Sequence, residues 1–229
     1  MQIPFEAVDV ANDPGGMERL RALGLRSVPV LARGDQYVFA VDLDAVARFV
    51  GLKDTGHTTL PPDVLVRRLV EILRTAQAIV RQIPDDKLTQ DAVHNRKRDL
   101  RLLSHHVFRI GEAYLEVAID GVPFARGLGE KPLAEGEFRT GEDIARYGDG
   151  VIKRLETWWD ELDDKTCGRS TEAYFGTTTL HMLLERSTWH PAQHTRQLSA
   201  VLEGFGITLD KALTPEMLAG LPLPERLWE

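Results

Sequence analysis

The sequence predicts a mainly α-helical protein, with a four-helix bundle that follows a small α/β domain. Three observations support this fold class. Apolar residues recur at helical spacing in four long segments after about residue 62, β-forming and helical segments alternate over residues 1–52, and a polar stretch at residues 53–61 separates the two patterns. We therefore expect an α/β domain at 1–52, a linker at 53–61, and a helical domain with a C-terminal extension at 62–229.

Composition narrows the class of protein before any motif is considered. The chain has 229 residues, of which 43% are apolar and 28% are charged, as in ordinary globular proteins. Its net charge of -7 argues against nucleic-acid binding, which requires clustered Lys and Arg. The sequence has neither a run of about 20 apolar residues nor a basic N-terminus followed by an apolar segment. We expect a cytoplasmic protein that contacts no membrane.

The first fifty residues alternate between β-forming and helical patterns. In order, we expect a strand over Ile3–Val10, a helix from Asp13-Pro14 to Gly24, a hairpin over Val28–Ala40 that turns at Arg33–Asp35, and a helix over Leu43–Val50 that ends at Gly51. Asp13 is the expected N-cap of the first helix, and Pro14 suits its first turn.

Four longer segments have the apolar spacing of amphipathic helices. They run over about Pro62–Ile83, Asp99–Ile119, Gly141–Leu162 and Thr178–Phe205. The connection over residues 120–140 is rich in Gly and Pro, which favours a crossover or a wall over the mouth of the bundle. We interpret the basic run Arg96–Arg98 as the solvated start of the second of these helices.

Three histidines occupy positions where the helical stripes would otherwise place leucine. His190 and His194 lie four residues apart on the apolar stripe of the last helix, so both imidazoles can reach one metal ion. His106 lies on the corresponding stripe of the second long helix. We therefore predict one divalent metal on these three residues, and the alternative is that they are hydrogen-bonded core histidines. His105 falls off the stripe, so we expect it at the surface or behind the ligands, unless it replaces His106.

Several other residues next to this pattern have simpler interpretations. Pro191 follows His190 directly, and it would either bend the helix or begin a new one. His57, His94 and His181 are expected to be structural or solvated. The single cysteine, Cys167, lies in a polar stretch, and we interpret it as an incidental loop thiol.

The histidine segments carry a family resemblance. The stretch Ser-Thr-Trp-His-Pro-Ala-Gln-His-Thr-Arg-Gln-Leu at 187–198 resembles the signature of the DinB-like metal-dependent superfamily, and Leu-Leu-Ser-His-His-Val at 102–107 resembles its second-helix motif. That superfamily includes bacillithiol transferases and mycothiol-dependent maleylpyruvate isomerase. The resemblance extends over about residues 62–206. It implies a four-helix bundle, a divalent metal on His106, His190 and His194, and chemistry with low-molecular-weight thiols.

The N-terminal segment resembles the second half of a glutaredoxin. The matching parts are residues 3–10 and 24–30, a hairpin, and the helix after Asp42. Val28-Pro29 matches the loop whose proline is cis in that family and whose preceding backbone pairs with a bound thiol. The family's first strand, first helix and cysteine-containing turn are missing, and residues 1–60 contain no cysteine, which excludes dithiol redox chemistry. Either the sheet finds a substitute partner, such as a second subunit, or the start codon lies within a longer gene.

Together these resemblances favour a metal-dependent thiol S-transferase or isomerase of the glutathione type. Zinc or nickel is the expected metal, and iron and manganese also accept imidazole. The expected partners are a small-molecule thiol, an electrophile and a second copy of the chain. Val28, Pro29, Arg109 and Arg196 are the candidate thiol-binding residues, although both arginines could instead be surface helix residues.

Other functions use the same metal ligands. One is a non-catalytic binding or dimerisation module that the metal stabilises. Another is a metal-dependent hydrolase, for which Glu112 and Glu185 are weak candidates for the base. We also expect Gln197 to support the metal site and Trp189 to line its mouth, whereas Trp158-Trp159 is expected to pack in the core or at an interface. The sequence identifies no catalytic residue.

Overall fold

The fold is mainly α-helical, as the sequence predicts. The structure is a computed structural model that describes residues 4–10, 13–26, 28–40, 43–53, 56–93, 96–130, 132–134 and 136–228. Contacts divide the chain into two compact units, Met1–Thr58 and Thr59–Glu229. The division falls within residues 53–61, the segment expected to be the linker.

The N-terminal unit contains a hairpin and two short helices. Its elements are α1 (Gly16–Ala22), β1 (Val30–Arg33), β2 (Gln36–Phe39) and α2 (Leu43–Val50). The hairpin is confirmed, and Gly34, with φ 60°, supplies the left-handed backbone conformation that its two-residue turn needs. The Val28-Pro29 peptide bond is cis. Asp13 as the N-cap of the first helix is wrong: α1 begins later, with Gly15 as its N-cap, and the Asp13 carboxylate accepts the Gly15 N–H at 2.9 Å.

The expected strand at the N-terminal end is wrong within the described residues, because residues 4–10 form no strand. Strand-forming side chains are not sufficient by themselves, since a strand is stabilised by pairing with a neighbour. Among the residues of this unit that the structure describes, β1 and β2 pair only with each other.

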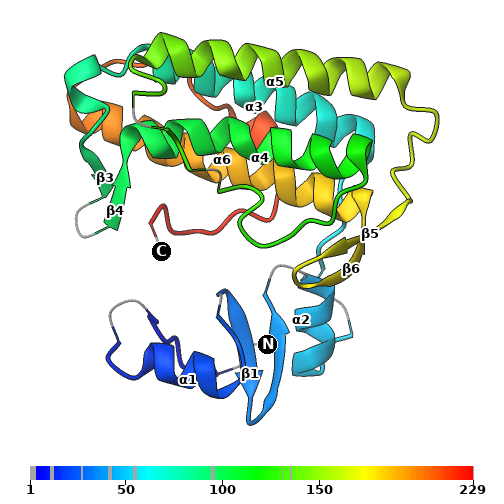
Figure 1. Ribbon diagram of the computed structural model, residues 1–229. Coiled ribbons are helices and arrows are strands. Elements are labelled where there is room, and N and C mark those ends of the chain that lie inside the picture. Colours follow the sequence, from blue (N-terminus) through cyan, green and yellow to red (C-terminus); the bar gives the residue numbers. More distant parts are fainter. Residues whose placement is uncertain are drawn as a thin grey trace. The chain divides into compact units, whose positions relative to one another are not determined.

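Four long helices pack around one apolar core in the second unit (Figure 1). They are α3 (Pro62–Arg81), α4 (Leu100–Asp120), α5 (Gly141–Glu161) and α6 (Leu180–Gly204). Both α5 and α6 pack against α3 and α4. The four long helical segments predicted from the sequence are confirmed to within two residues at every end.

Local capping determines where these helices begin and end. The Asp99 carboxylate accepts the Leu102 N–H at 2.7 Å and caps α4. Thr140 and Asp143 form a reciprocal capping box at the start of α5. Gly121, with φ 70°, ends α4 in the left-handed conformation that glycine adopts most easily.

One close approach fixes the packing of α5 on α4. A Cβ added at Gly148 would lie 2.6 Å from the ring of Phe108, which is fully buried. Only glycine therefore allows the two helices to approach this closely. Gly150, on the same helix, has no heavy atom within 4 Å of its added Cβ, so this constraint is confined to one face.

Two hairpins join the long helices, and the sequence analysis identified neither. β3 (Asp91–Val93) and β4 (Arg96–Asp99) lie between α3 and α4, while β5 (Ser170–Ala173) and β6 (Gly176–Thr179) lie between α5 and α6. A short 3-10 helix at Asp85–Lys87 precedes β3, and α7 (Pro215–Leu218) follows α6. The run Arg96–Arg98 is therefore strand and not the start of a helix. Asp99 is both the last residue of β4 and the N-cap of α4, and its backbone is extended as in a strand.

The structure also decides two points that the sequence left open. Pro191 lies inside α6, which is a single helix, so a new helix does not begin there. Cys167 lies in the loop between α5 and β5, as expected, but its side chain is buried, with 1% of its surface exposed, and burial raises the pKa of its thiol. In the described part of the chain, no helix is long and apolar enough to cross a membrane.

Candidate metal centre

Three imidazoles from two helices converge on one point. His106 comes from α4, and His190 and His194 come from α6. The Nε2 atom of His190 lies 3.4 Å from Nε2 of His106 and 2.9 Å from Nε2 of His194. One ligand atom from each of the three residues lies within 4.8 Å of the others. The arrangement could hold one metal ion.

Two of the rings are held in the orientation that a metal requires. Nδ1 of His106 donates to the carbonyl of Gly129 at 2.8 Å, and Nδ1 of His194 donates to the side-chain carbonyl of Gln197 at 2.7 Å. Because a carbonyl only accepts, each Nδ1 carries the proton and each Nε2 presents its lone pair to the cluster. The expectation that Gln197 supports the site is thus consistent with this geometry.

The third ring has a different environment. Trp189 stacks on His190 with ring centroids 5.4 Å apart and an interplanar angle of 12°. Nδ1 of His190 is buried and has no hydrogen-bond partner among the described residues. The Nε2 lone pairs of His106 and His194 both face this ring. If Nε2 of His190 carries a proton, it can donate a hydrogen bond to only one of them. A cation between the three nitrogens satisfies all of them, so the donor set fits a metal ion.

The electrostatic environment keeps the three rings neutral. Burial lowers the pKa of His106 and His190 well below the ordinary value for histidine, and it lowers the pKa of His194 to about 4. The positive charge of Arg98 lowers all three further. Neutral imidazole is the form that binds metal, so the ligands need no deprotonation at neutral pH.

His105 lies beside the cluster but is not part of it. Its ring is buried, with 4% exposed, and stacks between Phe138 at 5.2 Å and Tyr147 at 5.0 Å, measured between centroids. A surface position for His105 is therefore wrong. The sequence could not show that His105 is buried, because the residue that stacks on it, Phe138, comes from the loop between α4 and α5 and covers a face of α4 outside the apolar stripe.

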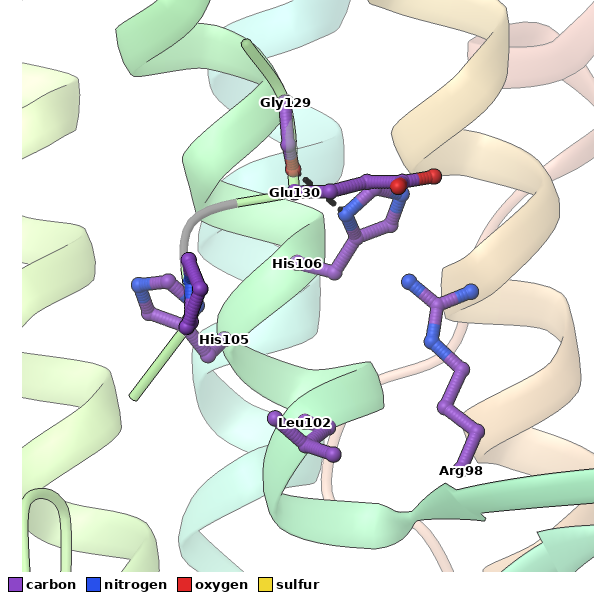
Figure 2. Close-up of a pocket in the computed structure, with 7 residues that line it drawn as sticks. Arg98, Leu102, His105, His106, Gly129 and Glu130 are labelled. Atoms are coloured by element: carbon purple, nitrogen blue, oxygen red, sulfur yellow. Dashed lines mark hydrogen bonds between the residues drawn. The ribbon is translucent and has the colours of Figure 1, made fainter. Parts of the chain in front are cut away.

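A pocket of about 370 Å³ opens beside His106 (Figure 2). Its lining consists of Arg98, Leu102, His105, His106, Gly129, Glu130 and Pro132. Three of them, Gly129, Glu130 and Pro132, belong to the connection between α4 and α5, which was expected to be a crossover or a wall over the mouth of the bundle. This connection forms one wall of the pocket.

The two arginines predicted to bind a thiol are both engaged elsewhere. Arg109 is buried and donates to both carboxylate oxygens of Glu116 at 2.7 and 2.8 Å, and to Glu112 at 2.9 Å. A surface position for Arg109 is therefore wrong as well. Arg196 donates to the side chain of Gln193 and to the carbonyl of Pro224. The other two candidates, Val28 and Pro29, belong to the N-terminal unit, where Val28 is 49% exposed.

The carboxylates considered as bases also have structural partners. Glu112 accepts from Arg109 and, at 2.6 Å, from the Tyr147 hydroxyl. Glu185 accepts from the Thr59 hydroxyl. The acidic residue that lines the pocket is Glu130, which the sequence analysis did not select. It lies in a loop, where no periodicity indicates its neighbours.

The remaining histidines and the tryptophan pair fit structural roles. His181 is within hydrogen-bonding distance of the Leu60 carbonyl, at 2.8 Å. His57 is half-buried, and His94 lies outside the described residues. Trp158 packs edge-on against Tyr114 in the core, with ring centroids 5.2 Å apart. Core packing of Trp158 is thereby confirmed.

Comparison with known proteins adds no identification. No family model matches the chain, and no curated protein or solved structure gives a significant match. The DinB-like and glutaredoxin-like resemblances therefore remain predictions. The case for a metal centre is based on the geometry of the three histidines.

Proposed function

We propose that the helical unit is a DinB-like four-helix bundle and that the protein is a metal-dependent thiol S-transferase or isomerase. One observation carries the proposal: three neutral imidazoles converge next to a pocket, and one of them, His106, also lines that pocket. A structural metal site is usually enclosed by four protein ligands, whereas a catalytic site keeps one position open. A three-histidine set beside a pocket corresponds to the second arrangement.

His106, His190 and His194 would hold the ion, with zinc or nickel as the first choice and iron or manganese as alternatives. A divalent ion at this position supplies a positive charge that favours the thiolate form of a bound thiol. The chain contributes the rest. Gly129 and Gln197 hold two of the rings, and the pocket accommodates a small thiol and an electrophile beside them.

The resemblance of the N-terminal unit to a glutaredoxin supports a separate thiol-recognition role for the backbone at Val28-Pro29. We propose that glutathione or a similar low-molecular-weight thiol is the partner, that the protein acts in the cytoplasm, and that two copies of the chain can associate. The hairpin of this unit offers strand edges that a second copy could pair with.

A metal-dependent hydrolase is the second candidate, and a specific observation favours it over the non-catalytic module. Glu130 lines the pocket together with His106, so a carboxylate is available to act as a base near the proposed ion. Glu112 is less suitable, because Arg109 and Tyr147 already bind its carboxylate.

The decisive test is elemental analysis of protein purified without chelator or affinity tag. We expect about one equivalent of metal in the parent and almost none in a His190→Ala/His194→Ala double variant. A matched control is His105→Phe, which keeps an aromatic ring between Phe138 and Tyr147 and should retain the metal. His106→Phe, at the neighbouring position, should lose it.

Two outcomes would contradict the proposal. A folded parent that binds no metal after incubation with zinc, nickel, iron and manganese would refute the metal centre. Loss of metal in the His105 variant, with retention in the His106 variant, would show that the wrong ligand was assigned. If metal binds as expected, thiols combined with electrophiles and ester or amide substrates should be screened to separate the transferase from the hydrolase.

A further inference from the structure

Charged groups in the pocket indicate what kind of ligand it accepts. Among the seven lining residues, Arg98 carries a positive charge and Glu130 a negative one, while Leu102 and Pro132 are apolar. The histidines are neutral, for the reasons given above. In Figure 2 the Arg98 side chain extends from β4 toward the ring of His106.

Arg98 lies beside the candidate metal centre. It lines the same pocket as His106, and its side chain extends toward the ring of His106, one of the three imidazoles that lie together (Figure 2). A metal ion there would add two positive charges next to that of Arg98. With one carboxylate, from Glu130, the pocket would keep a net positive charge that attracts an anion.

We propose that Arg98 binds the carboxylate of a small anionic ligand whose other end, a thiol, reaches the metal centre. This inference deepens the proposed function and depends on it, because it names the substrate class and the residue that selects it. A guanidinium can form two parallel hydrogen bonds with a carboxylate, which gives both affinity and orientation.

The size of the pocket sets a limit on the ligand. A cavity of about 370 Å³ suits a molecule of small-metabolite size, since ligand pockets range upward from about 300 Å³. Leu102 and Pro132 offer apolar contact for the carbon chain that joins the thiol to the carboxylate.

The experiment compares a negatively charged thiol with its neutral methyl ester. Full-length protein is loaded with Co(II), its cobalt content is measured, and 3-mercaptopropionate or its methyl ester is titrated while sulfur-to-cobalt charge-transfer absorption is followed. A hydrogen bond to a charged group contributes about tenfold or more in affinity. We therefore expect the parent to bind the acid at least about tenfold more tightly than the ester.

Variants show whether Arg98 is responsible for that preference. Arg98→Gln should bind cobalt normally and bind the two thiols about equally. Arg98→Lys should keep part of the preference, because the charge remains but the planar pair of donors is lost. Arg67→Gln, an exposed position on α3 with the same change in net charge, should behave as the parent does.

The outcomes separate this inference from the proposed function. If cobalt does not bind, or if neither thiol reaches it, both are refuted. If both thiols bind cobalt but the parent shows no preference for the acid, or if Arg98→Gln and Arg98→Lys both keep the full preference, the assignment of Arg98 is wrong while the metal centre stands.

Discussion

The hydrogen bond between Gln197 and His194 offers a sharp test of how the metal centre is organised. Gln197 is buried and forms two contacts: its carbonyl accepts from Nδ1 of His194 at 2.7 Å, and its amide donates to the carbonyl of Leu227 at 2.9 Å. Gln197 thus joins His194, a candidate metal ligand, to the C-terminal segment. The substitution Gln197→Leu keeps the approximate size of the side chain and removes both contacts.

The size of the effect follows from the role of the Nδ1 contact. Without an acceptor, the His194 ring is free to rotate and to exchange tautomers, so Nε2 no longer presents its lone pair at all times. Loss of such a supporting hydrogen bond typically weakens metal binding about 10- to 100-fold, or about 1.4–2.7 kcal/mol. Gln197→Glu keeps the acceptor and loses the donor, so we expect the metal affinity to be retained.

Gln193 provides a matched control on the same helix. It is buried to a similar degree, and its amide donates to the Leu227 carbonyl at 2.8 Å, but none of its hydrogen bonds involves a histidine. Gln193→Leu should therefore change metal affinity less than about threefold, even though it loosens the same C-terminal segment. Zinc affinity is measured by competition with a chromophoric chelator at constant pH.

Equal losses of affinity in Gln193→Leu and Gln197→Leu would refute the reasoning, because they would assign the effect to the C-terminal segment and not to the acceptor on His194. Unchanged affinity in Gln197→Leu would refute it as well.

Three further predictions concern stability. Gly148→Ala should destabilise the fold by about 1–3 kcal/mol through a clash in the core, whereas Gly150→Ala should stabilise it by about 0.5–1 kcal/mol. Urea unfolding measures both changes, and equal effects of the two substitutions would contradict the packing argument. Arg109→Met should cost about 2–3 kcal/mol because it removes both hydrogen bonds from Arg109 to the Glu116 carboxylate and one to Glu112. Arg74→Met, in an exposed pair, should cost less than about 1 kcal/mol in the same assay. Metal-free protein should lose stability as the pH falls from about 6.5 toward 4. Folding lowers the pKa of His194 to about 4, so the unfolded chain binds the proton first as the pH falls. The midpoint temperature of thermal unfolding is measured across that range, and a midpoint that does not change with pH would contradict the prediction.

The sequence was sufficient to predict the long helices and the three histidines that lie together. Helical periodicity is a local signal, so the bounds of α3 and α5 could be placed from their apolar spacing to within two residues. The spacing of His190 and His194 is likewise a property of a single helix. The apolar stripe of α4 indicated His106 as the third residue, and His106, His190 and His194 lie together in the structure.

Contacts between distant segments could be decided only by the tertiary structure. Arg98 comes from an unexpected hairpin and Glu130 from a loop, yet both line one pocket with His106. Arg109 looked available for a ligand, because its helix position does not show that Glu116 and Glu112 would bind it. The physical reason is the same in each case: periodicity identifies the face of an element, whereas the partners of a charged side chain depend on which other elements fold against that face.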